Sequence, residues 1–167
     1  MRKKSHISLA RFLVKGMEND VLSRRWKAFY VGSLLPDCRP SFLTVRHEYD
    51  ETYELVEKKI HKLVEDVKRR PADSMRYMID LGQVFHYIAD YFTFPHNRHY
   101  PGNLKDHCIY EKYLKFELRA YIRENHQEYM QRSHDVEEDC EYITRVCSRV
   151  LAAMIWLVNT SELAKAA

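Results

Sequence analysis

The chain has 167 residues, of which 46% are hydrophobic. That is enough to bury a core without disulfide or metal support, so we expect one domain over residues 1–167. The net charge of +3 is spread along the chain and is too small to indicate, by itself, a stable nucleic-acid complex or an anionic membrane partner. No apolar run reaches the roughly 18 residues that a membrane-spanning helix needs, so no transmembrane segment is expected.

The four cysteines show no Cys-x-x-Cys spacing, which argues against a thiolate zinc site or a redox motif. Cys140 and Cys147 are two helical turns apart, and we expect them to be small buried side chains. The basic start Met1-Arg-Lys-Lys is followed by a short apolar stretch broken by Arg11, without a signal-peptide cleavage pattern. A reduced, cytoplasmic protein is the simplest expectation.

Hydrophobic periodicity and helix breakers predict an all-α fold: a single compact multi-helix domain with short connections. In chain order, helices are expected over about 5–15, 21–34, 50–70, 74–91, 105–131 and 136–157. Pro36 is expected to stop the second helix and Pro71 the third. Asp73 or Ser74 should start the fourth helix. The proline- and asparagine-containing stretch over 92–105 predicts a loop.

Histidines and carboxylates fall at metal-ligand intervals within residues 86–111. His86 and Asp90 are four residues apart, so they can present two ligand groups from one helix face. His107 and Glu111 have the same spacing, and His96 lies between the two pairs, directly after a proline where the chain can bend back. Imidazole with carboxylate suits zinc and its first-row neighbours better than calcium or magnesium. The pattern therefore favours a metal-dependent hydrolase over a generic helical domain.

The same histidine–acid spacing also occurs in ordinary solvated helix pairs, so the surrounding residues must show whether a pair belongs to a metal site. It occurs five times in this chain, and His61 belongs to a charged stripe that indicates a surface position. His86 lies among apolar residues instead, where a histidine and an acid are costly unless they are paired or bind a metal. Gly82 and Ala89, about one turn to either side, would leave room for an ion. Periodicity alone also allows His86 to be a core histidine that pairs with Asp90 without a metal.

Five pieces of sequence occur in a specific order along most of the chain. They are His6, the segment Gly32-Ser-Leu-Leu-Pro-Asp37, His47 ten residues later, the His86/Asp90 pair with His96, and the His107/Glu111 pair. In this order and at these intervals they resemble the zinc-dependent phospholipase C family, an all-helical fold related to single-strand-specific zinc nucleases. The chain resembles a compact, non-secreted relative that lacks the additional membrane-binding domain of toxin members.

The resemblance implies a site with two to three zinc ions. Three ligand sets follow from it: Asp37, His47, His86 and Asp90 for one zinc; His96, His107 and Glu111 for a second; and Asp90 with His6 for a third. The resemblance also implies that Asp37 is the catalytic carboxylate that orients or deprotonates the attacking water. Glu111 is a second candidate for that role.

The chain departs from the family pattern in two places. In secreted relatives a tryptophan exposed by processing gives its amino group and carbonyl to the third metal, whereas only Met1-Arg-Lys-Lys-Ser precedes His6 here. Replacement by Met1, a two-metal site and a weak third metal all stay open. Choline-selecting members place an aromatic residue beside the aspartate that corresponds to Asp37, and this chain has Cys38. A phosphatidylcholine preference is therefore not implied.

These residues and the resemblance together imply a phospholipase C-like phosphodiester hydrolase in which a zinc-activated water attacks phosphorus. The expected partner is a phosphodiester substrate, with phospholipid as one candidate, and nothing in the sequence indicates an oligomeric state. A zinc-dependent, single-strand nuclease-like phosphodiesterase ranks lower because the chain has aromatic residues but no concentrated basic stripe. A non-catalytic helical metal-binding protein also stays open.

Other polar residues carry weaker expectations. Gln83, Asn97 and Tyr110 are placed to hold the metal ligands by hydrogen bonds. The His134-Asp135 doublet resembles that of metal phosphohydrolases, but it falls in an expected surface loop.

Overall fold

The structure is a computed structural model, and it describes residues 1–16, 20–38, 47–69, 74–96, 103–124, 140–141, 143–149 and 152. Its elements are the α-helices α1 (Lys3–Gly16), α2 (Asp20–Arg24), α3 (Trp26–Cys38), α4 (Tyr49–Arg69), α5 (Met75–Tyr91) and α6 (Leu104–Glu124), and the short 3-10 helix η2 (Phe94–His96). The described residues within 140–149 are also helical. No strand occurs in these ranges, which confirms the all-α prediction.

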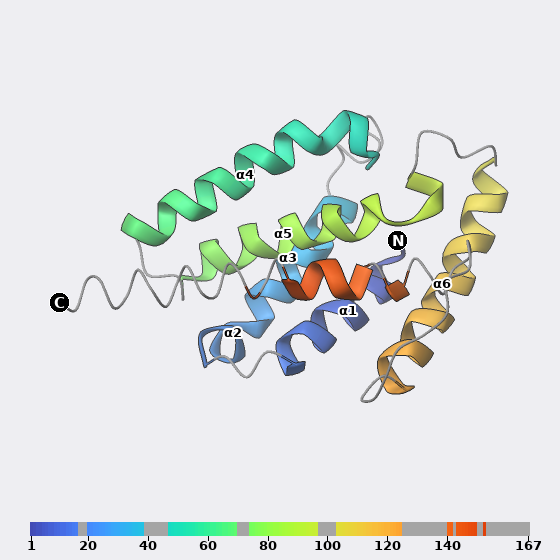
Figure 1. Ribbon diagram of the computed structural model, residues 1–167, viewed down its shortest axis with the longest axis horizontal. Coiled ribbons are helices and arrows are strands. Elements are labelled where there is room, and N and C mark those ends of the chain that lie inside the picture. Colours follow the sequence, from blue (N-terminus) through green and yellow to red (C-terminus); the bar gives the residue numbers. More distant parts are fainter. Residues whose placement is uncertain are drawn as a thin grey trace.

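Helices α3 and α5 lie side by side at the centre of the molecule (Figure 1). Helix α4 packs on α5, helix α1 packs on α3, and α6 packs on α1 along one edge. The amino terminus lies between α5 and α6, inside this arrangement (Figure 1). Among the described residues, no helix combines the length and apolar character needed to cross a bilayer.

Two glycines allow the central helices to approach closely. A Cβ atom on Gly32 would overlap the carbonyl of Ile79, and one on Gly82 would overlap the carbonyl of Phe29. The expectation that Gly82 leaves room for an ion is therefore wrong, because the backbone of α3 fills that space. The glycine has a different use: it brings α3 within reach of the polar side chains of α5.

Most of the expected helices occur, with two corrections. The helix expected over 21–34 is divided into α2 and α3 at Arg25, and α3 runs on to Cys38 instead of stopping at Pro36. Proline removes one N–H from the ladder, and this loss is small so close to the helix end. Because α3 continues, Asp37 lies on a helix in its last turn rather than in the expected loop.

The long helices start and end near their expected residues. The helix expected over 50–70 is Tyr49–Arg69, and the one expected up to Tyr91 is Met75–Tyr91. Ser74 caps the latter, because its hydroxyl accepts a hydrogen bond of 3.2 Å from the Tyr77 backbone N–H. The expected 92–105 loop contains η2, and α6 begins at Leu104. Pro71, the end of the helix expected over 105–131 and much of the one expected over 136–157 lie outside the described residues.

Candidate metal centre

His86 is the buried centre of the site. Its Nδ1–H donates a hydrogen bond of 2.9 Å to the carbonyl oxygen of Ser33 on α3. That bond fixes the ring orientation and leaves Nε2 with its lone pair free, the arrangement typical of metal-binding histidines. Nε2 lies 3.2 Å from Asp90 Oδ2 and 3.6 Å from Asp37 Oδ1. Helix α3 thus supplies both the carbonyl that holds His86 and one of the carboxylates that it faces.

His47 completes a compact group of four ligand atoms. Its Nδ1 lies 3.2 Å from His86 Nε2, 3.5 Å from Asp90 Oδ2 and 3.8 Å from Asp37 Oδ1. A tetrahedral zinc with bonds of roughly 2.0–2.1 Å requires its ligand atoms to be about 3.3 Å apart. Five of the six distances among these four groups lie between 3.2 and 3.8 Å, close to the spacing around such an ion.

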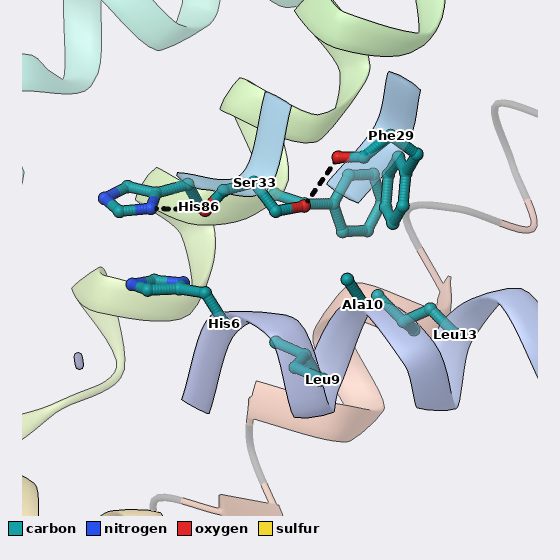
Figure 2. A pocket seen from close by; sticks show the side chains of 8 residues that line it. His6, Leu9, Ala10, Leu13, Phe29, Ser33 and His86 are labelled. Atoms are coloured by element: carbon teal, nitrogen blue, oxygen red, sulfur yellow. Dashed lines mark hydrogen bonds between the residues drawn. The ribbon is translucent and has the colours of Figure 1, made fainter. Parts of the chain in front are cut away.

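His6 adds a further imidazole from α1. Its ring stacks on that of His86 (Figure 2), with centroids 3.9 Å apart and planes 18° apart. Its Nε2 lies 3.3 Å from Asp90 Oδ1. On the other side of the stacked rings, Leu9, Ala10, Leu13 and Phe29 line a cavity of about 10 Å³. A cavity of that size holds at most one water molecule, so it is not a substrate pocket.

Asp90 is fully buried, and its two carboxylate oxygens face the Nε2 atoms of His6 and His86, respectively. Its Oδ2 and the Nε2 of His6 are buried atoms without a hydrogen-bond partner among the described residues. Buried polar atoms are normally hydrogen-bonded, and a buried carboxylate surrounded by imidazole lone pairs requires a cation. The donor set therefore fits a transition metal of the zinc type.

A second group of ligand atoms lies beside the first. His107 and Glu111 are one turn apart on α6, with His107 Nε2 at 3.2 Å from Glu111 Oε1. The ring of His96, from η2, meets that of His107 edge to face at 5.0 Å between centroids. Thr93 holds His96 in place, because its hydroxyl lies 2.6 Å from His96 Nδ1 and donates to the Asp90 carbonyl at 2.8 Å. The imidazole Nε2 of His96 is thereby left for a ligand.

The amino group of Met1 joins the two groups. It is buried, forms an ion pair with Asp90 Oδ1, and lies 3.5 Å from Glu111 Oε1. Burial opposes its charge, but Asp90 and Glu111 outweigh this effect and raise the pKa of the amino group. In this structure the ammonium is the cation that compensates the buried carboxylate, at the place where the resemblance implies a third metal.

Burial and neighbouring charges shift the pKa values of the ionisable groups of the site in different directions. Burial lowers the pKa of His6 to about 3 and that of His96 to about 3, so both imidazoles are neutral at pH 7 and can bind a metal. Burial opposes ionisation of Asp90, but the Met1 ammonium and neighbouring histidines hold its pKa well below the usual value. Burial raises the pKa of Asp37, because the opposing effect of His86 is smaller than the effect of desolvation.

The structure brings all eight expected ligand residues together. Within each of three groups the ligand atoms lie within 4.8 Å of one another: His6/Asp37/His86 and His47/His86/Asp90, which share His86, and the separate group His96/His107/Glu111. That these residues bind zinc stays a prediction, as do the catalytic roles of Asp37 and Glu111. His61, expected to be at the surface, is exposed on α4.

Sequence reasoning missed the groups that orient the ligands. The Ser33 carbonyl gives no signal in a sequence, whereas Thr93 could have been found as a hydroxyl three residues before His96. Gln83, expected to support the ligands, instead bonds Lys59 and Asp80, about two turns from Asp90 along α5. Asn97, His134 and Asp135 lie outside the described residues.

Comparison with protein families matches residues 5–158 to the family described as zinc dependent phospholipase C. No curated protein and no solved structure matches the chain. The match covers most of the sequence and includes all eight expected ligand residues. The chain therefore belongs to the zinc-dependent phospholipase C family.

Proposed function

We propose that the protein is a zinc-dependent phosphodiester hydrolase of the phospholipase C type. The ligands proposed for one zinc are Asp37, His47, His86 and Asp90, those for a second are His96, His107 and Glu111, and Asp90 with His6 would contribute to a third. Family membership supports zinc and a phospholipid or related phosphodiester substrate. The observation that carries the proposal is the 3.2–3.5 Å spacing of the His47, His86 and Asp90 ligand atoms, together with a buried Asp90 oxygen that has no hydrogen-bond partner among the described residues.

The exposure of the site supports catalysis rather than a purely structural role. The side chains of His86 and Asp90 are closed to solvent, but those of Asp37, Glu111 and His107 are 19%, 16% and 26% exposed. A structural zinc site is enclosed by its four protein ligands, whereas a catalytic site keeps an open position. A phosphodiester would approach from the side where these three residues meet solvent.

Bound zinc lowers the pKa of a coordinated water to about 7 and neutralises charge on the phosphoryl oxygens. Asp37 is placed to accept a proton from the attacking water, because its carboxylate is partly open to solvent beside the buried ligands His86 and Asp90. Glu111 is also partly exposed, and its carboxylate can accept a hydrogen bond from a water in the open site. The buried Asp90 is the electrostatic centre and has no route to substrate.

Hydrolysis of a chromogenic aryl phosphodiester by the zinc-loaded protein tests the proposal. We expect measurable turnover, and we expect Asp37→Asn to lower it by about 100-fold or more with zinc in excess, as removal of a general base does. Asp80→Asn is the matched control, since this carboxylate faces Lys59 and Gln83 away from the site. Full zinc loading without hydrolysis of the aryl diester or of any phospholipid would overturn the proposed function.

A further inference from the structure

Helix α6 carries an apolar stripe on its outer face. Ile109, Tyr113 and Phe116 are spaced four and three residues apart, so they share one side of the helix. Their exposed fractions lie between 44% and 60%, whereas Leu114 and Leu118 on the opposite side are fully buried. The helix is therefore apolar on two sides, and only one of these sides has a partner within the described residues.

Lysines border this stripe. Lys105 and Lys112 are exposed and lie one turn before Ile109 and Phe116, respectively. The Nζ of Lys115 lies over the Phe116 ring, 3.9 Å from its centroid. The only exposed acid among the side chains described on α6 is Asp106, in the first turn. Apolar and aromatic side chains flanked by lysines are typical of a helix that lies in the interface of an anionic membrane.

The stripe and the metal centre share the same helix. Helix α6 forms one edge of the molecule (Figure 1). Its residues His107 and Glu111 belong to the site, whereas the stripe is exposed to solvent. Helix α1, which packs on α6, begins with the exposed Lys3 and Lys4 and adds positive charge near this edge. A surface bound by the stripe would therefore contact the outer face of the helix whose inner face carries His107 and Glu111.

We propose that the outer face of α6 docks the protein on the surface of an anionic phospholipid bilayer. The rings and Ile109 would enter the headgroup region, and the lysines would pair with lipid phosphates. A second copy of the chain fits less well, because a stable protein interface needs about 800 Å² and 20–30 residues on each partner, far more than one helical stripe offers. The inference rests on the proposed function, since it makes membrane lipid the source of the phosphodiester.

Sedimentation with large unilamellar vesicles tests the docking surface. The zinc-loaded protein should bind vesicles of phosphatidylcholine with 30% phosphatidylserine more tightly than vesicles of phosphatidylcholine alone. Ile109→Ser with Phe116→Ser should weaken binding to both by about tenfold or more, because it removes the inserted apolar groups. Lys105→Glu with Lys112→Glu should weaken binding about tenfold or more on the anionic vesicles only.

Val31→Ser with Leu55→Ser is the matched control, because these apolar side chains are 51% and 47% exposed on α3 and α4. It should leave vesicle binding unchanged, and all variants should hydrolyse a water-soluble aryl phosphodiester at the wild-type rate. If the Ile109/Phe116 variant does not fold, the single change Tyr113→Ser takes its place with a smaller expected loss.

No vesicle binding by the wild-type protein would overturn the inference. So would a dimer that dissociates when Ile109 and Phe116 are replaced, which would show that a second copy covers the stripe. The two proposals fail separately. Hydrolysis of the soluble diester without vesicle binding removes only the docking surface, and vesicle binding without any hydrolysis removes only the proposed function.

Discussion

At the scale of single residues, the site depends on hydrogen-bond partners that orient its histidine side chains. His86 and His96 each have one ring nitrogen engaged, by the Ser33 carbonyl and the Thr93 hydroxyl, respectively. In both rings the other nitrogen is thereby the one left for a metal. Such partners are known to set the orientation and basicity of metal-binding imidazoles.

Thr93→Val should weaken zinc binding without unfolding the protein. The change keeps the side-chain volume but removes the hydroxyl, which accepts a hydrogen bond from His96 Nδ1–H and donates one to the Asp90 carbonyl. We expect zinc affinity to fall by about 10- to 100-fold, measured by competition with a chelator, and Thr93→Ser to restore it.

Thr144→Val is the control for this experiment. Its hydroxyl is also buried, but it bonds the carbonyls of Cys140 and Glu141, at 2.9 and 3.0 Å, and no ligand residue among those described. It should cost about 1 kcal/mol of stability and leave zinc affinity unchanged. Equal zinc affinity in Thr93→Val and the wild-type protein would show that the hydroxyl does not position His96.

Spacing in the sequence predicted the ligand pairs that come from one helix. His86/Asp90 and His107/Glu111 are four residues apart, and the structure places both pairs in the cluster. The same rule also selected His61, which is exposed, so apolar context was needed to separate the two kinds of pair. The orienting Ser33 carbonyl could not be predicted, because every residue has one.

At the scale of helices, the close crossing of α3 and α5 sets the distance between Asp37 and His86. Each helix contributes a glycine at the point of contact. Periodicity and the Ser74 start predicted the two helices. The expectation that Gly82 leaves room for an ion was wrong. A glycine inside a helix leaves space, and only the structure shows that the neighbouring backbone fills it.

Gly82→Ala should destabilise the protein strongly. The new methyl group would overlap the Phe29 carbonyl, which belongs to a helix backbone that cannot move without shifting α3. We expect a loss of about 1–3 kcal/mol or more in the free energy of unfolding, measured by denaturant titration.

Lys58→Ala serves as the control for the helix crossing. This side chain is 78% exposed on α4, and its ion pair with Glu54 is open to solvent. Its replacement should change the free energy of unfolding by no more than about 0.5 kcal/mol. If Gly82→Ala behaves like Lys58→Ala, the helices do not cross as closely as described.

At the scale of the whole molecule, the fold converts a scattered set of polar residues into one cluster. His6 on α1 and Asp90 on α5 are 3.3 Å apart, although 84 residues separate them in the sequence. Periodicity predicts which face of each helix is apolar, but it does not determine which helices meet. The expected convergence came from resemblance to a family, to which residues 5–158 indeed belong.

The convergence also explains why so much charge is buried in a small domain. Asp90 and the Met1 ammonium are nearly closed to solvent and compensate each other, and the buried neutral imidazole of His6 lies 3.3 Å from Asp90. Isolated burial of any one of them would be costly. A cluster of this kind is stable only when cations balance the carboxylates, and bound zinc would provide that balance more fully than one ammonium group.

Elemental analysis of the protein purified without chelator tests the metal centre most directly. We predict at least two equivalents of zinc in the wild-type protein, loss of at least one in His86→Ala, and no loss in His61→Ala, whose side chain is exposed on α4. Wild-type protein without bound metal, or full zinc content in His86→Ala, would contradict the assignment of these residues as ligands.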